Sequence, residues 1–166
     1  MQDQSITVLV PLTRGKVAII DAEDAERILA FTWHATAMGY AARKRQRRDG
    51  PGPHLVYMHR FILGVDDGVH VDHADGNTLN NRRSNLREAT PQQNQRNRGA
   101  QRNSKSGYKG VSWHKQTRKW AVRIKAGGSY RHVGLFEDVI EAARAYDAVA
   151  REAFGEYAWL NFPDDH

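Results

Sequence analysis

The segment from Val69 to Asn77 places an acidic side chain directly before a histidine. These two residues are Asp72 and His73, and Asn85 and Asn94 follow them along the chain. An imidazole titrates near neutral pH and suits a base that takes a proton from water. Carboxylate and amide oxygens suit Mg²⁺ better than a softer ion, and few protein ligands leave room for water and phosphate oxygens. These residue types could hydrolyse a phosphodiester, with His73 as base and Asp72 and Asn94 as metal ligands.

The same segment is open to other interpretations. A lone histidine is more often structural than catalytic, and His70 and His73 together with Asp72 could form most of a zinc site. The downstream asparagines favour the catalytic interpretation. Asn80 and Asn81 are expected to form the loop rather than to bind a metal.

Local patterns predict a strand, a long loop, a second strand and a helix around these residues. Val69 to His73 alternates as a strand does, and Asp75-Gly76-Asn77 is typical of a turn. Thr90, Pro91 and Gln93 match the cap and first turn of a helix. Adjacent strand residues point to opposite faces, so Asp72 and His73 can share a site only where the strand ends or bulges.

Short strands are expected on both sides of this segment. The N-terminal ones are Ile6 to Leu12 and Val17 to Ile20, followed by a further pair within Trp33 to Arg45 and Leu55 to His59. Near the C-terminus, apolar residues at 3- to 4-residue spacing predict one helix from Val139 to Phe154. Three strands before it are predicted at Tyr108 to Val111, Trp120 to Lys125 and His132 to Phe136.

The charge of the chain is concentrated in its middle. The 166 residues carry a formal net charge of +6, but residues 82–125 hold 13 Lys and Arg against one acid, Glu88. Such a block is expected of a polyanion binder, because each cation that faces a phosphate releases condensed counterions. The chain has no cysteine, which excludes disulfides and cysteine-based zinc clusters. Its apolar runs are too short to span a membrane, so we expect a soluble, cytoplasmic protein.

Several separated stretches resemble the HNH nucleases of the ββα-metal class, in particular their phage and intron homing branch. The matching text is YMHRFILG from Tyr57, then VDH, DGN, LNN, SNLRE and QQNQRNR, ending at Arg98. The resemblance implies that His73 is the general base, that Asn85 holds the loop and orients His73, and that Asp72 and Asn94 bind Mg²⁺ or Mn²⁺, with no zinc. His59 and Arg60 match the family's HR pair, whose role could be either packing or contact with a phosphate.

The C-terminal residues resemble the AP2 domain, which is fused to some homing endonucleases. The matching text is SGYKGVSW from Ser106, KWAVRIK, HVGLF, EAARAYDAVAREAFG and LNFP. The resemblance implies a three-stranded sheet that binds duplex DNA through its exposed face. The candidate DNA-binding residues of the basic block and the sheet are Arg96, Arg98, Lys109, His114, Lys119, Arg123, Lys125 and Arg131.

Two features limit what this second resemblance implies. Ser112 and His132 replace an arginine and a tryptophan of the plant AP2 proteins, so no base preference can be inferred. Strand parity places Arg123 and Lys125 on one face, and Trp120 on the face opposite to them, where it can pack beneath the sheet.

The sequence therefore predicts an α+β protein of two small domains. Residues 1–98 would form an HNH nuclease with extra strands, 99–106 a linker, and 107–166 an AP2 domain whose three-stranded antiparallel sheet packs on one helix. The expected function is a homing-type DNA endonuclease that acts on double-stranded DNA in a bacterial or phage-infected cell, with no obligatory protein partner. The alternative is a transcriptional regulator that binds DNA through the AP2 sheet and carries an inactive HNH remnant.

Overall fold

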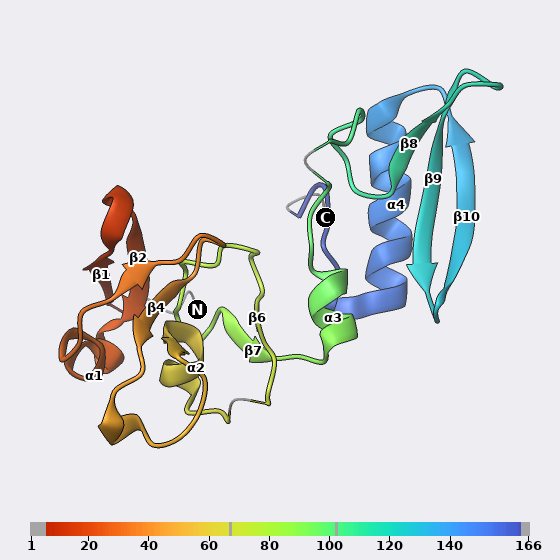
Figure 1. The fold of residues 1–166 in the computed structure, drawn as a ribbon. Coiled ribbons are helices and arrows are strands. Elements are labelled where there is room, and N and C mark those ends of the chain that lie inside the picture. The colour runs from red at the N-terminus through yellow and green to blue at the C-terminus, as the bar shows by residue number, and fades with distance from the viewer. Residues whose placement is uncertain (1–5, 67, 102, 164–166) are drawn as a thin grey trace. The chain divides into compact units, whose positions relative to one another are not determined.

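The computed structural model describes residues 6–66, 68–101 and 103–163. The chain divides into two compact units, Met1–Pro91 and Gln92–His166 (Figure 1). In the described ranges, every helix is too short or too polar to cross a lipid bilayer.

The N-terminal unit consists of short strands and short helices. Its strands pair antiparallel in three groups: β1 with β2, β3 with β4 and β5, and β6 with β7. The elements in order are β1 (Thr7–Pro11), η1 (Thr13–Gly15), β2 (Val17–Asp21), η2 (Ala22–Asp24), α1 (Ala25–Leu29), β3 (His34–Ala35), β4 (Ala41–Lys44), η3 (Arg47–Asp49), β5 (Leu55–Tyr57), α2 (Met58–Leu63), β6 (Val71–His73) and β7 (Leu86–Glu88).

One apolar core joins the β6–β7 pair to the first part of the chain. Val71 and Leu86 belong to the same buried cluster as Ile20 and Ile28, and the last two are fully buried. Burying such side chains stabilises each by about 1.5–3 kcal/mol relative to exposure. The N-terminal strands and helix thus supply the core that two short strands could not form alone.

Polar contacts with β2 and η2 anchor the long loop of residues 74–85. The backbone N–H of Ile19 donates to the Leu79 carbonyl at 2.8 Å, and that of Asn81 donates to the Ile19 carbonyl at 2.7 Å. Arg83 donates through its backbone N–H to Asp21 at 2.7 Å and through its guanidinium to Asp24 at 2.8 Å. Because Asp24 is only 2% exposed, this ion pair satisfies a charge that would otherwise be costly to bury.

A second ion pair joins the buried Arg43 on β4 to Asp49 in the loop between β4 and β5. Arg43 is 2% exposed and makes two hydrogen bonds with the Asp49 carboxylate, of 2.5 and 2.6 Å. Its guanidinium also lies 3.9 Å from the ring centroid of Phe31. This ion pair holds the pKa of Asp49 well below its usual range.

The C-terminal unit is a three-stranded antiparallel sheet packed on one long helix (Figure 1). The strand order is β10-β9-β8, and Asp138 caps α4 by accepting hydrogen bonds from the backbone N–H groups of Ile140 and Glu141. The elements are α3 (Pro91–Arg96), whose first residue closes the N-terminal unit, then β8 (Val111–His114), β9 (Lys119–Ala126), β10 (Ser129–Phe136), α4 (Val139–Phe154) and η4 (Gly155–Tyr157).

The core of this unit lies between α4 and the sheet. Val122, Ile124 and Tyr146 are at most 3% exposed. Gly110 has a φ of +76°, and a Cβ there would lie 2.1 Å from the Tyr146 ring and 2.9 Å from the Arg123 carbonyl oxygen. A glycine is required at this position both for its backbone conformation and for the close approach of the ring.

The end of the described chain is tied to α4 and to the start of the sheet. The buried Asp147 carboxylate accepts hydrogen bonds from the backbone N–H groups of Asn161 and Phe162, both of 2.8 Å. The Asn161 side chain donates to Asp147 and to the Lys109 carbonyl, and accepts from the Lys109 N–H at 2.8 Å. One asparagine thus joins three separate segments.

Most predicted elements are present, with one clear error. The strand, long loop, strand and helix order around His73 is confirmed, as is the helix from Val139 to Phe154. The strand predicted at Tyr108 to Val111 is wrong, because β8 begins at Val111. Gly107 and Gly110 both have positive φ, so the backbone turns where the sequence predicts an extended strand.

Candidate functional site

Asp72 lies in the middle of β6, directly opposite Arg87 on β7. It is 4% exposed, and its Oδ2 accepts hydrogen bonds from Nε and Nη2 of Arg87 at 3.0 and 2.8 Å. A buried carboxylate is costly unless it is paired and hydrogen-bonded, and Arg87 provides both the counter-ion and the hydrogen bonds.

His73 is the last residue of β6, and it is also 4% exposed. Its ring lies beside Tyr40 and His59, with centroid separations of 6.0 and 5.1 Å. Burial lowers the pKa of His73, while a hydrogen bond with Asn81 and the nearby Asp75 and Asp72 oppose that shift. Because the lowering prevails, the imidazole is neutral near pH 7, as a general base must be.

Asn81 contacts the Nε2 atom of the His73 ring. The Asn81 amide nitrogen donates to the Leu79 carbonyl at 3.1 Å, which orients the amide oxygen toward His73 Nε2 at 3.4 Å. An amide oxygen only accepts hydrogen bonds, so this contact favours the tautomer with the proton on Nε2 and the lone pair on Nδ1.

Asn85 connects the two ends of the long loop. Its side chain accepts from the Asp75 backbone N–H at 3.0 Å and donates to the Asp75 carboxylate and the Asn80 carbonyl at 2.9 and 2.8 Å. Its backbone carbonyl accepts from the N–H of Ala74, the residue after His73. These contacts hold the loop, and the orientation of His73 by Asn85 stays a prediction.

His59 and Arg60, the predicted phosphate contacts, lie on α2. His59 is 7% exposed, and burial, followed by the charges of His73 and Arg60, lowers its pKa to about 3. The Arg60 guanidinium donates to the backbone carbonyls of Asp66 and Val69. Both residues support the walls of the site, and their contact with a phosphate stays a prediction.

The predicted metal ligands lie in different units. Asp72 belongs to the N-terminal unit, whereas Asn94 lies on α3 within the unit that begins at Gln92. No three His, Asp or Glu side chains in the described ranges gather as cation ligands. The buried Asp72 carboxylate suits a hard divalent cation that keeps several waters, and Asn94 as a second ligand stays a prediction.

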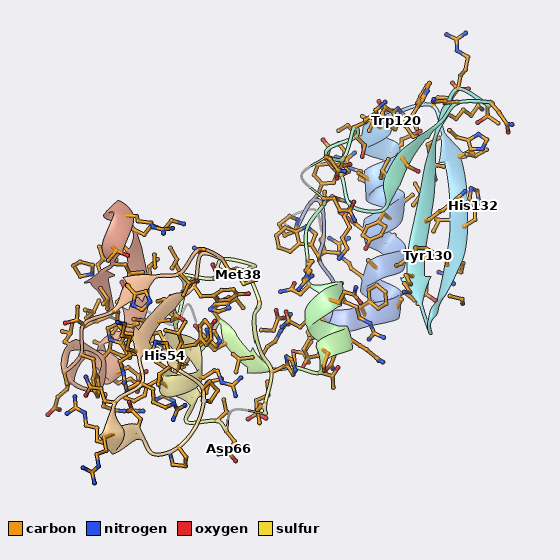
Figure 2. All side chains as sticks on the ribbon, in the orientation of Figure 1. Met38, His54, Asp66, Trp120, Tyr130 and His132 are labelled. Carbon is orange, nitrogen blue, oxygen red and sulfur yellow. The ribbon has the colours of Figure 1, made fainter. Side chains whose placement is uncertain are left out.

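In the C-terminal unit, Arg123 and Lys125 project from the face of the sheet opposite to α4. Both are exposed, whereas Val122 before them and Ile124 between them are buried. This alternation confirms the prediction that Arg123 and Lys125 share one face of the strand. Their cross-strand partners on β10 are His132 and Tyr130, whose side chains are labelled in Figure 2. Trp120 packs against the core, as its parity predicts.

The remaining DNA-binding candidates differ in their surroundings. Lys119 pairs with Glu137 at 3.2 Å, and His114 Nδ1 lies 2.9 Å from the Thr117 hydroxyl. Lys109 donates to the Arg96 carbonyl, and burial lowers its pKa to about 8. Arg98 and Arg131 are exposed.

An open groove within this unit brings cationic and aromatic side chains together. Residues 98–101 and 103–106 line it together with parts of β8 and β9. Its cationic and exposed aromatic lining residues include Arg98, Lys105, Arg123, Lys125, Trp113 and Tyr130. Such a lining suits a polyanion with stacked or apolar groups.

Sequence reasoning misses two residues of the site. It predicts only a loop-forming role for Asn81, and it includes Arg87 only as part of the basic block. The antiparallel pairing of β6 with β7 could have indicated Arg87, because it places a cation opposite Asp72. The contact between Asn81 and His73 depends on how the loop folds, for which the local pattern holds no signal.

Comparisons with known proteins match the segment that contains these residues. Residues 56–96 match the model of an HNH endonuclease family, a segment that includes Asp72, His73, Asn85 and Asn94. Protein 3.8 of Escherichia phage T7 is 34% identical over 114 residues, covering 69% of this chain and 93% of the relative. An uncharacterized HNH endonuclease of Acanthamoeba polyphaga mimivirus is 28% identical over 165 residues, covering 95% of this chain and 82% of the relative. No solved structure matches. The matched segment contains the β6–loop–β7 site, so residues 56–96 form an HNH endonuclease domain.

Proposed function

We propose that this protein is a metal-dependent DNA endonuclease of the homing type. The observation that carries the proposal is the setting of His73. Its ring is buried and has a lowered pKa, and the Asn81 amide oxygen faces its Nε2 atom, which favours a proton there. This arrangement leaves a neutral imidazole with a defined basic atom, which is what phosphodiester hydrolysis by a general base requires.

In the proposed reaction, His73 Nδ1 takes a proton from water as the water oxygen attacks phosphorus in line. The bond between phosphorus and the 3′ oxygen breaks, and the 3′ oxygen then takes a proton from solvent. The products are a 5′ phosphate and a 3′ hydroxyl. The anchored loop supports this step, because Asn81 and Asn85 keep the imidazole and the following turn in place.

A divalent cation, Mg²⁺ or Mn²⁺, would stabilise the negative charge that develops on the phosphate and the leaving oxygen. Asp72 would hold it from β6, and the sequence pattern assigns Asn94 as the second protein ligand. HNH nucleases generally depend on a divalent metal, which agrees with this donor set.

The test is the nicking of supercoiled plasmid with Mg²⁺ present and with EDTA added. We expect His73→Ala to lower the cleavage rate about 10²- to 10⁴-fold while duplex binding is retained. His54→Ala is the matched control, because His54 is exposed in the loop between β4 and β5 and should cut as the wild type does. Equal cleavage by His73→Ala and wild type would overturn the assignment.

The C-terminal unit would position the nuclease on duplex DNA as an AP2-type sheet. The exposed face with Arg123 and Lys125, and the helix packed on the opposite face, support this assignment. In this proposal residues 1–98 cut, 99–106 link and 107–166 bind. A chain that retards DNA in a gel but never nicks it would instead be a DNA-binding regulator.

A further inference from the structure

The pairing of Asp72 with Arg87 differs from that of an ordinary surface ion pair. The carboxylate is 5% exposed by its side chain and the guanidinium 16%. Two nitrogens of Arg87 meet the same oxygen, Oδ2, at 3.0 and 2.8 Å. The strand register places the two residues directly opposite each other, so the backbone itself holds the pair together.

A positive charge therefore already lies beside the carboxylate that would bind the metal, in contact with its Oδ2. Charges of the same sign repel strongly at such short range when both are partly removed from water. The free energy of metal binding at Asp72 must therefore include the cost of weakening the contact between Asp72 and Arg87. Without Arg87, in turn, the buried carboxylate would have lost its cross-strand counter-ion.

We propose that Arg87 is a resident counter-ion that competes with a divalent cation for Asp72. Arg87 stabilises the metal-free fold and lowers the affinity for the metal. It acts on the metal through Asp72 and is in this sense a positioning residue. This inference rests on the proposed function, because it takes Asp72 as a metal ligand.

Arg82 provides a matched control in the same unit. Its Nε lies 2.9 Å from Asp21 Oδ1, and the side chains are 25% and 11% exposed, so this is also a partly buried Arg–Asp pair. Asp21 anchors the long loop and is not a proposed metal ligand. Losing the Arg82 pair should therefore affect folding without changing competition at Asp72.

The experiment measures Mn²⁺ binding to the full chain by calorimetry, and thermal unfolding with and without Mn²⁺. We expect Arg87→Gln to tighten Mn²⁺ binding at least about tenfold, since a positive charge is removed beside the site. Its Tm without metal should fall, and Mn²⁺ should raise that Tm by more than it raises the wild-type value. Arg82→Gln should lower Tm with no change in Mn²⁺ affinity.

Two further variants separate the possible failures. Asp72→Asn should abolish Mn²⁺ binding, and unchanged binding would remove Asp72 as a ligand and overturn both proposals. If Asp72→Asn abolishes binding while Arg87→Gln binds no more tightly than wild type, only the role of Arg87 is overturned. Arg87→Lys keeps the charge and tests the case in which Arg87→Gln does not fold: its affinity should stay within about threefold of wild type. Removing the charge is expected to tighten Mn²⁺ binding roughly tenfold. If Arg87→Lys, which keeps the charge, tightened Mn²⁺ binding by as much, competition by charge would be contradicted.

Discussion

The arginines of the N-terminal unit and the cationic residues of the C-terminal sheet carry the same charge but differ in their surroundings. In the first unit, arginines meet carboxylates that are mostly buried, in the pairs Arg43–Asp49, Arg82–Asp21, Arg83–Asp24 and Arg87–Asp72. On the sheet, Arg123, Lys125 and Arg131 are exposed. The basic block from 82 to 125 is therefore not one surface: its first part holds loops in place, and its later part is available to a polyanion.

This comparison predicts a large loss of stability when an inward arginine is removed. Arg83→Ala should lower the free energy of unfolding by about 3 kcal/mol, because Asp24 would stay buried without its main partner. Urea unfolding followed by circular dichroism measures the change. Lys16→Ala, at an exposed position, is the control and should change it by less than about 0.5 kcal/mol. A comparably small effect of Arg83→Ala would remove the distinction between the two groups of cations.

The C-terminal unit should instead be most sensitive to changes in packing. Gly110→Ala would place a Cβ against Tyr146 and the Arg123 carbonyl, which we expect to cost about 2 kcal/mol more than Gly107→Ala. Gly107 has nearly the same φ, +74°, but no atom lies within 4 Å of the position that a Cβ would take there, so it isolates the steric part. Urea unfolding of the two variants gives the comparison, and equal losses would leave only the backbone conformation as the cause.

A pH dependence should be traceable to the buried His59 of the N-terminal unit. Unfolded histidine takes up a proton near pH 6.5, whereas burial lowers the pKa of His59 to about 3 in the folded chain. Its contribution is therefore complete above pH 6.5 and is lost as the pH falls toward 3. The free energy of unfolding of the wild type should fall when the pH is lowered from about 7 to about 5. In His59→Phe this fall should be smaller by about 1–2 kcal/mol. Urea unfolding at both pH values measures this, and an unchanged loss would assign it to other groups.

The smallest effect on stability is expected on the sheet, where binding should change instead. Arg123→Ala should alter the unfolding free energy by less than about 0.5 kcal/mol. The slope of log binding constant against log salt for duplex DNA should fall by about 0.9, the value for one phosphate contact. Fluorescence anisotropy over a salt series measures the slope. Arg144→Ala, on the helix that covers the other face, should leave this slope unchanged. An equal change of slope in Arg144→Ala would argue against DNA binding by the exposed face of the sheet.

Local patterns predict the elements but not the partners of their side chains. The apolar stripe of α4 and the turn residues after His73 are short-range signals, and both elements lie where the sequence predicts them. Arg83 meets Asp24, which lies 59 residues earlier in the chain, and no periodicity reports such a pairing. For the same reason the sequence identifies His73 but cannot show that Asn81 contacts its ring.

The joining of Asp147, Asn161 and Lys109 has a consequence for the order in which the chain can fold during synthesis. The contacts of the N-terminal unit lie within Met1–Pro91, so that unit can close while later residues are still being translated. The C-terminal sheet and helix cannot complete their hydrogen bonds until Asn161 and Phe162 have left the ribosome. The unit that holds Asp72 and His73 would thus fold before the unit that holds Asn94 and the proposed DNA-binding sheet.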